Sequence, residues 1–334
     1  MRILALHDTA LTCALALAAA APLACNRAPP PSAPFRLAFF PNLTHAQALV
    51  GNGEGLFAKA TGGAVTVRQF NAGPAAMEAL LAGDVELVYV GPGPATIAYL
   101  RSDGAALRVV AGAVSGGAQL IARTARNPGD LAGKRVASPQ LGNTQDIALR
   151  TWVMAQGMTV GEGPSDVKVT PLSNPDIVGL FGRGELEGAW VPEPWGARLR
   201  AEAGGHVLVD ERDLWEGRKF PTTIVVASRR ALEARRRDVV AVLRVHLALT
   251  ERWRADPAGF ARTANAEYGK LTGHPLPDAV LQDAFSRLEP TDDPLQRQLV
   301  EGALHAQALK FAPRGDLAAM VDPSLLAEAR QPAR

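Results

Sequence analysis

Two stretches of this chain, which begin about 100 residues apart, share one pattern of residue types. The first runs from Met77 to Gly93 and the second from Val178 to Pro194. Each has a helical run, a glycine, an acidic residue, a strand pattern with a glutamate and an aromatic residue, and a turn rich in Gly or Pro. Solenoid repeats are shorter, at roughly 20–50 residues. The pattern therefore predicts two similar α/β lobes facing a shared cleft, since ligands bind at the carboxyl ends of strands in open α/β sheets.

Strand and helix patterns alternate along most of the chain, which predicts an α/β fold with parallel or mixed sheets. Apolar, β-rich runs predict strands at 35–40, 64–70, 85–90, 107–113, 118–122, 135–138, 167–172, 188–191, 206–209 and 222–227. Helical patterns lie between them at 45–60, 74–81, 95–101, 144–156, 175–181 and 195–203. Later helices are expected from a cap at Ser228 to about 253, and at 257–270, 277–288 and 293–309, before a polar surface tail.

This order of elements predicts a chain that enters lobe 1, crosses to lobe 2 and returns. We expect lobe 1 at 35–114 and 222–334, and lobe 2 at 115–221. Candidate crossings are 112–117 and 217–222. Their glycines would tolerate hinge-like changes of the backbone.

The N-terminus has the features of an export signal. Residues 1–24 combine Arg2 with an apolar, alanine-rich run. That run is too short for a membrane-spanning helix of ~20 residues and fits a secretory signal peptide. Cys25 follows small residues and begins a Pro-rich segment, 25–34, as in lipoprotein signals. We expect Cys25 to be lipidated and the Pro-rich segment to act as a tether, with simple cleavage nearby as the alternative. The protein is then periplasmic or on the cell surface.

Composition and charge argue against several classes of protein. Cys13 and Cys25 are the only cysteines, so the exported globule would contain no disulfide. The formal net charge is +2, and the one basic concentration, within 229–244, is expected to be a solvated helix face. We therefore expect no nucleic acid partner. The histidines are scattered without metal-ligand spacing, so we expect no metal and no cofactor.

Five loops that follow predicted strands carry the residue types of an anion site. They combine glycines, which let the backbone approach a ligand, with small hydroxyl and amide side chains that would cap helices. Helix N-termini attract anions because their first N–H groups are unpaired and carry partial positive charge. Each loop alone also fits an ordinary turn, but five at the same edge of two sheets favour a cleft. The loops are 41–45, 71–74, 91–96, 115–118 and 139–146.

A sixth loop, 192–195, contains Glu193 and Trp195. Trp195 would stack on an organic part of a ligand. Glu193 would accept a hydrogen bond from an ammonium group or orient Gln145. Alternatively, it would pair with Arg198 and only shape the loop.

Five segments, in this order, resemble bacterial ABC-transporter substrate-binding proteins of the nitrate/sulfonate/taurine family. They are 39–49, 79–88, 139–146, 193–195 and 220–223, and the resemblance covers roughly 35–309. It implies a type II periplasmic-binding-protein fold, in which two α/β lobes with helix-flanked sheets close on a ligand in the cleft between them. Members deliver small molecules to a membrane permease and its ATPase, so both are expected partners. We also expect a monomer without catalytic residues.

Carried onto this chain, the resemblance implies a set of ligand-binding residues at strand ends. They are Asn42, Thr44, His45, Gly73, Pro74, Gly91, Pro92, Ser115, Gly116, Gly142, Asn143, Thr144, Gln145, Glu193, Trp195 and Thr222. None is an arginine or a lysine, which disfavours a dedicated nitrate site. An organic anion, such as an aliphatic sulfonate or a taurine-like molecule, fits this set better. A binder of nitrate or of a thiamine precursor is the alternative within the family.

An enzyme on the same fold is the alternative from another class. Relatives of this architecture include enzymes of pyrimidine or thiamine-precursor synthesis and of the menaquinone pathway. Such an enzyme would need a lysine or a nucleophile–base pair in the cleft. The lysines lie outside the ligand-facing loops and the globule has no cysteine, so we expect no catalysis.

Overall fold

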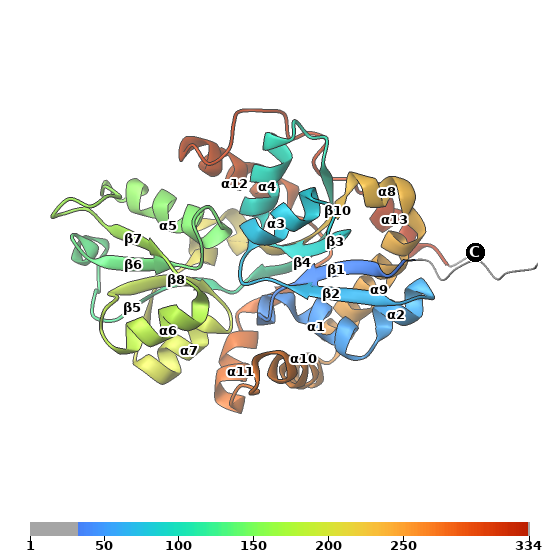
Figure 1. Cartoon of the computed structure of the whole chain (residues 1–334). Coiled ribbons are helices and arrows are strands. Elements are labelled where there is room, and N and C mark those ends of the chain that lie inside the picture. Colours follow the sequence, from blue (N-terminus) through green and yellow to red (C-terminus); the bar gives the residue numbers. More distant parts are fainter. Residues whose placement is uncertain (1–32, 333–334) are drawn as a thin grey trace, which may run out of the picture. The chain divides into compact units, whose positions relative to one another are not determined.

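The computed structural model describes residues 33–332 (Figure 1). The expected signal peptide at 1–24, Cys25 and most of the Pro-rich tether lie outside the described residues. None of the helices within 33–332 has both the length and the apolar character that a membrane crossing requires.

Lobe 1 is built on a six-stranded mixed sheet with the strand order β11-β4-β10-β3-β1-β2. β1 runs parallel to β2 and β3, whereas β10 lies antiparallel between β3 and β4. The late strand β10 thus completes a sheet begun by the first strands of the chain. The bounds are β1 (Phe35–Phe39), β2 (Val65–Gln69), β3 (Leu87–Val90), β4 (Leu107–Gly116), β10 (Pro221–Ser228) and β11 (Leu288–Pro290).

Lobe 2 is built on a five-stranded mixed sheet with the strand order β7-β6-β8-β5-β9. β6 runs parallel to β7 and β8, whereas β5 lies antiparallel between β8 and β9. The α/β class and the two mixed sheets predicted from the sequence are confirmed. The bounds are β5 (Ala118–Ala122), β6 (Arg135–Ser138), β7 (Lys168–Pro171), β8 (Gly188–Pro192) and β9 (His206–Asp210).

Helices flank both sheets (Figure 1). Those of lobe 2 are α5 (Thr144–Ala155), α6 (Asn174–Gly182) and α7 (Trp195–Ala203). The helices that precede lobe 2 are α1 (Ala46–Gly53), α2 (Leu56–Thr61), α3 (Gly73–Leu81) and α4 (Pro92–Arg101). Those that follow β10 are α8 (Arg229–Ala234), α9 (Arg236–Ala255), α10 (Pro257–Thr272), α11 (Asp278–Phe285), α12 (Gln296–Ala308) and α13 (Ser324–Arg330). Short 3-10 turns are η1 (Leu43–His45), η2 (Pro128–Leu131), η3 (Glu211–Leu214) and η4 (Glu216–Arg218).

The two repeated stretches hold equivalent places in the two sheets. β3 lies between a parallel neighbour, β1, and an antiparallel one, β10, and β8 lies in the same way between β6 and β5. Gly83 and Gly184, which follow the helices, both adopt positive φ, at 79° and 76°. Residues with a Cβ rarely adopt that conformation. Tyr89 and Trp190 are both fully buried. The sequence repeat therefore reflects one structural unit used twice.

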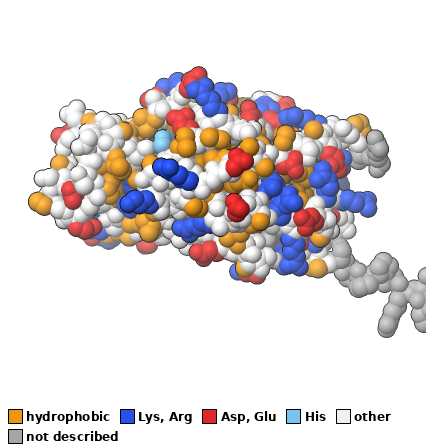
Figure 2. Space-filling model, turned by 90° about the horizontal axis from the view of Figure 1, so that it is seen from above, with side chains coloured by type: hydrophobic (Ala, Val, Ile, Leu, Met, Phe, Trp, Pro, Cys, Tyr) orange, Lys and Arg blue, Asp and Glu red, His pale blue; other side chains and the backbone are white. Residues whose placement is uncertain are grey.

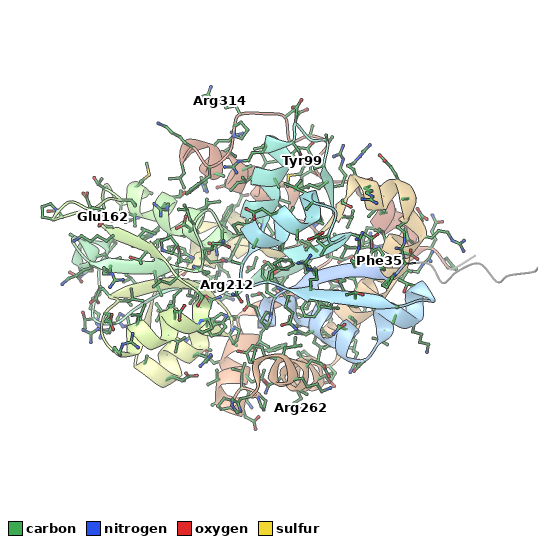
Figure 3. All side chains as sticks on the ribbon, viewed as in Figure 1. Phe35, Tyr99, Glu162, Arg212, Arg262 and Arg314 are labelled. Carbon is green, nitrogen blue, oxygen red and sulfur yellow. The ribbon has the colours of Figure 1, made fainter. Side chains whose placement is uncertain are left out.

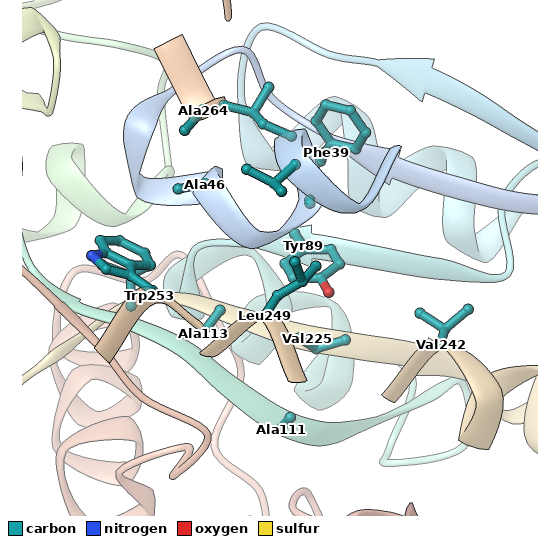
Figure 4. Close-up of a cluster of buried hydrophobic side chains, with 14 of the residues drawn as sticks. Phe39, Ala46, Tyr89, Ala111, Ala113, Val225, Val242, Leu249, Trp253 and Ala264 are labelled. Atoms are coloured by element: carbon teal, nitrogen blue, oxygen red, sulfur yellow. The ribbon is translucent and has the colours of Figure 1, made fainter. Parts of the chain in front are cut away.

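The inner strands of the lobe 1 sheet are buried on both faces, because their side chains alternate between two faces that helices cover. Phe35, Leu37 and Phe39 of β1 belong to the cluster packed against α1, α9 and α10. Ala38 belongs to the cluster on the opposite face, against α3 and α4. Figure 4 shows part of the first cluster, in which Tyr89 lies among residues from several helices. Burial on both faces explains why these strands read as continuous apolar runs.

Three expectations about the helices are corrected by the structure. The helix expected at 45–60 is divided into α1 and α2, because Gly55 adopts a left-handed conformation between them. The helix expected from Ser228 to about 253 is interrupted at Arg235, although the Ser228 hydroxyl does accept from Ala231 N, at 3.1 Å. The tail is not confined to the surface, since α13 buries Leu325 in the lobe 1 core.

The distribution of charged side chains on the surface agrees with the nearly neutral charge of the chain. Figure 2 shows Lys and Arg interspersed with Asp and Glu on the face that it presents. In the basic segment, Arg236 pairs with Glu328 at 2.9 Å and Arg235 with Asp238 at 2.6 Å. The Arg236–Glu328 pair is exposed, and pairs of that kind add little stability. Arg235, Asp238 and Arg244 are partly buried, so only part of this segment is the solvated helix face that its sequence predicts.

The chain crosses between the lobes twice. β4 ends at Gly116 and β5 begins at Ala118, while η3 and η4 lie between β9 and β10. Arg212, labelled in Figure 3, lies where the two sheets meet and donates to Asp210, with Nη2–Oδ2 at 2.7 Å. Glu211 beside it is buried, and its Oε2 accepts from Trp190 Nε1 at 2.7 Å. Burial raises the pKa of Glu211 to about 7.

We expect replacement of Glu211 by glutamine to change the pH dependence of stability. The folded-state pKa of about 7 exceeds the ordinary value of 4.5. The protonated Glu211 therefore stabilises the folded state most below pH ~4.5, and this stabilisation is lost as the pH rises through about 7. Between pH 5 and pH 8 this loss is roughly 2–3 kcal/mol. The free energy of unfolding of Glu211→Gln, relative to that of the wild type, should therefore be higher at pH 8 than at pH 5 by that amount. Urea unfolding of both proteins at both pH values measures this difference. If the two proteins differ by the same amount at both pH values, the assignment is wrong.

Candidate ligand-binding site

An inner cavity lies where the strand ends of the two sheets meet. It is lined by residues that follow β1, β2 and β3 of lobe 1 and β6, β7 and β8 of lobe 2, together with the first residues of β10. Its volume is about 30 Å³. The lining residues are Phe40, Asn42, Thr44, His45, Asn71, Ala72, Gly73, Gly91, Pro94, Pro139, Asn143, Thr144, Gln145, Asn174, Pro192, Thr222 and Thr223.

Helices begin at this cavity from both lobes. In lobe 1, no side chain caps the starts of η1, α3 and α4, whose cap residues are Asn42, Ala72 and Gly91. In lobe 2, Asn143 caps α5 by accepting from Asp146 N at 2.7 Å, and Ser173 caps α6. First-turn N–H groups without a side-chain cap favour an anion, because the helix dipole places partial positive charge there. In α4, however, Pro92 and Pro94 have no N–H and the Gly93 N–H already donates to Thr144 Oγ1. The starts of η1 and α3 therefore make the lobe 1 wall the side of the cavity suited to an oxyanion.

The cavity has a polar but uncharged lining. Among the described residues that line it, none is an Asp, Glu, Lys or Arg. His45 is buried, and burial lowers its pKa to about 3, so it is neutral near pH 7. Its ring packs edge-on against Phe40, with centroids 4.6 Å apart. A bound anion would be held by dipoles and hydrogen bonds rather than by a salt bridge.

Three buried polar atoms in the lining have no hydrogen-bond partner among the described residues. They are His45 Nδ1, Asn174 Oδ1 and Thr223 Oγ1. Leaving such an atom unsatisfied costs about 1–3 kcal/mol. Thr223 Oγ1 and His45 Nδ1 of lobe 1 can donate to a ligand oxygen, whereas Asn174 Oδ1 of lobe 2 accepts from a ligand donor.

The structure brings together most of the residues predicted for the site. The cavity lining includes Asn42, Thr44, His45, Gly73, Gly91, Asn143, Thr144, Gln145 and Thr222. The loop at 139–146 is held by Asp146, whose carboxylate accepts from Ser138 Oγ at 2.7 Å and from Gly142 N at 2.9 Å. Those bonds keep Asn143 and Thr144 at the cavity wall.

The remaining predicted residues lie outside the inner cavity. Pro74 and Pro92 are in the first turns of α3 and α4. Ser115 and Gly116 form the end of β4, where Gly116 O accepts from the Thr222 hydroxyl. Gly142 adopts positive φ in the loop before α5. Trp195 lines a neighbouring hollow.

Glu193 turns away from the cavity, toward α7 and the hinge. Its Oε2 accepts from Ala197 N at 2.8 Å, and its Oε1 lies 3.2 Å from Arg200 Nη2. The pairing of Glu193 with Arg198 weighed in the sequence analysis is wrong, because Arg198 pairs with Glu202. Nor does Glu193 contact Gln145 through any hydrogen bond found within 33–332.

Several lining residues were not singled out from the sequence. Asn71 and Thr223 lie in segments that the sequence analysis had selected, but only their neighbours were named. Asn174 follows the strand predicted at 167–172 and begins α6. The rule that selected the other loops, polar residues between a strand end and a helix, would also have found Asn174.

The two lobes touch directly beside the cavity. Gly93 N, at the start of α4, donates to Thr144 Oγ1 of α5 at 3.2 Å. Trp195 Nε1, at the start of α7, donates to Asn42 Oδ1 at 2.8 Å. Both bonds join a residue of lobe 1 to a residue of lobe 2, so the cleft is closed around the cavity.

Comparison with known proteins identifies the family. The sequence model of the NMT1-like family matches residues 28–267. The chain belongs to the NMT1-like family. This NMT1-like protein is 26% identical over 251 residues to the taurine-binding periplasmic protein of Escherichia coli K12, covering 69% of this chain and 71% of that protein.

Solved structures share the fold of this NMT1-like protein. The alkanesulfonate-binding protein SsuA from Xanthomonas axonopodis pv. citri, bound to MOPS, matches with a TM-score of 0.70 and 22% identity, over 89% of this chain and 97% of that one. The periplasmic nitrate-binding protein NrtA from Synechocystis PCC 6803 matches with a TM-score of 0.76 and 13% identity, over 90% and 89%. The two-lobed periplasmic-binding-protein fold expected from the sequence is confirmed.

The relatives also define the functional class. This NMT1-like protein is homologous to substrate-binding proteins of ABC importers, which are not enzymes. Proteins of this kind bind small anionic ligands and work with a membrane permease and an ATPase. Because the relatives are periplasmic, the protein is an exported one.

Proposed function

We propose that this protein captures a small organic anion in the inner cavity and delivers it to a membrane permease of an ABC importer. The observation that carries the proposal is the cavity itself. It joins the start of α3, which has no side-chain cap, to unpartnered His45 Nδ1 and Thr223 Oγ1, which can donate to an anion, with no charged side chain in its described lining. Such a site suits a dispersed anionic charge with several acceptor oxygens.

The best-supported ligand class is the organic sulfonates. Three sulfonate oxygens match a cavity that offers hydrogen bonds from several directions. One relative is named for taurine and another for alkanesulfonates, which favours the same class. Nitrate is disfavoured, because neither Arg nor Lys occurs in the lining given by the described residues.

Ligand capture would proceed by closure of the two lobes. We place lobe 1 at 35–114 and 222–334, and lobe 2 at 115–221. Gly116 and Gly117 at the first crossing both adopt positive φ, at 78° and 75°, and would act as part of the hinge. A ligand that contacts both lobes binds the closed state best and shifts the population toward it.

We also propose that the mature protein is anchored through a lipid on Cys25. The cysteine follows small residues and is followed by the Pro-rich segment up to residue 34. An anchor would keep the binding protein close to its permease. Mass spectrometry of the membrane fraction should find an acylated Cys25, whereas a soluble, unmodified product would refute the anchor.

Thermal unfolding with a ligand panel tests the proposed function. The panel contains alkanesulfonates, taurine, nitrate, carboxylates and thiamine precursors. A ligand at a hundred times its Kd contributes about 2.7 kcal/mol to stability, which should raise the Tm by roughly 5 °C for a chain of this size. At least one sulfonate should produce this shift. If only nitrate or a thiamine precursor does so, the ligand class is wrong, and if no small anion does, the site is wrong.

A further inference from the structure

A second hollow, the outer chamber, adjoins the inner cavity. It measures about 480 Å³ and shares Asn42, Asn71 and Asn174 with the cavity lining. Residues of both lobes line it, including Tyr268 from α10 and Trp195 from α7. The two hollows are therefore neighbouring parts of one cleft.

The boundary between the two hollows is the hydrogen bond from Trp195 to Asn42. Asn42 lines both hollows, and its Oδ1 accepts from Trp195 Nε1 at 2.8 Å. The inner cavity, at about 30 Å³, accommodates a compact polar head group and little more. The rest of an organic ligand held there would extend into a neighbouring hollow. One of about 500 Å³ also adjoins the cavity, at Asn71, Ala72 and Pro139, but the outer chamber is the one that has the aromatic side chains of Trp195 and Tyr268 in its lining.

Part of the wall of the outer chamber is apolar, although polar and charged side chains also line it. Pro41 and Leu276 of lobe 1 and Pro175 and Trp195 of lobe 2 line it. Apolar walls stabilise a ligand in proportion to the apolar surface that they remove from water. The chamber thus differs in character from the polar inner cavity.

The charged groups of the chamber are already paired. Arg198 donates to Glu202 through two bonds, Nε–Oε1 at 2.7 Å and Nη2–Oε2 at 2.9 Å. The Arg198 guanidinium also lies 5.0 Å from the centre of the Trp195 ring. His274 is the other titratable side chain that lines the chamber besides Tyr268. A charged ligand group would have to compete with these contacts, whereas an uncharged one would not.

We propose that the outer chamber is the subsite for the organic tail of the ligand and selects an uncharged aliphatic or aromatic tail. This inference rests on the proposed function, in which the sulfonate group occupies the inner cavity. The favoured ligand is then a sulfonate with a tail of several carbons. A short tail that ends in an ammonium group would place a charge against apolar walls, which is unfavourable without a partner.

Calorimetric titration of the full mature protein with straight-chain sulfonates from methanesulfonate to hexanesulfonate tests the subsite. Each buried methylene contributes about 0.8 kcal/mol, so the affinity should rise about fourfold per added carbon. Propanesulfonate and taurine have the same number of heavy atoms along the tail and differ in the terminal group. Propanesulfonate should bind at least about tenfold more tightly, since one terminal methyl group is buried and no ammonium is desolvated.

Two variants of Trp195 separate the wall from the hydrogen bond. Trp195→Ala removes the indole wall. In this variant the affinity should rise much less with each added carbon, while methanesulfonate still binds. Trp195→Phe keeps an aromatic wall but removes the donor to Asn42, so the dependence should persist. The wild-type series requires no variant and keeps the test valid if Trp195→Ala fails to fold.

The outcomes distinguish this inference from the proposed function. If sulfonates bind but the affinity is independent of tail length, or taurine binds as tightly as propanesulfonate, the tail subsite is wrong and the proposed function stands. If no sulfonate binds, the proposed function fails and the inference fails with it.

Discussion

Replacing Arg200 with methionine is expected to lower the free energy of unfolding by about 3–5 kcal/mol, because it removes the nearer of the two cations that face a buried carboxylate. Glu193 is only 1% exposed, and Arg200 is the nearest cation to it, at 3.2 Å. Arg200 also donates to Gln119 and to Asp283 Oδ2, the latter at 2.6 Å from Nη2. Since Asp283 lies on α11 of lobe 1, Arg200 joins the two lobes behind the cleft.

Urea unfolding near pH 7 measures this effect. Arg183→Met is a matched control, because Arg183 and Glu185 form a largely exposed pair whose loss should cost about 0–1 kcal/mol. Adding Glu193→Gln to Arg200→Met should recover part of the loss, since the buried charge is then absent. If Arg200→Met lowers the free energy of unfolding no more than the control does, Arg200 does not stabilise the buried Glu193 carboxylate. Arg287 lies 3.8 Å from Glu193 and would then be its main cation.

Replacing Gly93 with alanine is expected to weaken ligand binding by about ten- to hundredfold, from overpacking of about 1–3 kcal/mol in the closed state. A Cβ at Gly93 would lie 2.9 Å from Ile147 Cδ1 and 3.1 Å from Thr144 Cα. Thr144 and Ile147 belong to lobe 2, whereas Gly93 belongs to lobe 1. The added methyl group would therefore hold the lobes apart, and the ligand could not contact both.

The same substitution should not destabilise the fold, since Gly93 lies in α4 and alanine is the better helix former by about 1 kcal/mol. Calorimetry gives the affinity for a sulfonate found in the ligand panel, and thermal unfolding without ligand gives the stability. Gly302→Ala is the matched control, because Gly302 lies in α12 and a Cβ there would meet only Trp215, at 3.9 Å. Unchanged affinity in Gly93→Ala would contradict closure at this contact.

Local patterns in the sequence were sufficient to predict most of the strands and the edge at which ligands bind. β5 and β6 occupy the ranges predicted for them, 118–122 and 135–138. Apolar runs of that length between turns have few other stable conformations in a folded chain. The loops after the strands could be placed at one edge because parallel strands share the direction of their carboxyl ends. For this reason Asn42, Gly91 and Asn143 come together from distant parts of the chain.

Other features required contacts between residues far apart in the chain. The antiparallel place of β10 between β3 and β4 depends on backbone pairing across more than a hundred residues, as for Ile224 with Val90. The interruption of the predicted helix at Arg235 accompanies an ion pair of that residue with Glu86, at 3.5 Å, far earlier in the chain. No local pattern of residues encodes either feature.

The sequence by itself determined the α/β class, the repeated unit and the set of loops that face the cleft, because strand and helix periodicity and turn chemistry are local properties. Only the tertiary structure decided which residues of those loops line the inner cavity, which line the outer chamber and which point elsewhere. It turned Glu193 away toward Arg200, placed Trp195 at the outer chamber, and left Asn174 and Thr223 at the inner cavity. The physical reason is that the direction of a side chain at a strand end depends on its packing and hydrogen-bond partners. Those partners lie in the adjacent helix α7 for Glu193 and in the opposite lobe for Trp195.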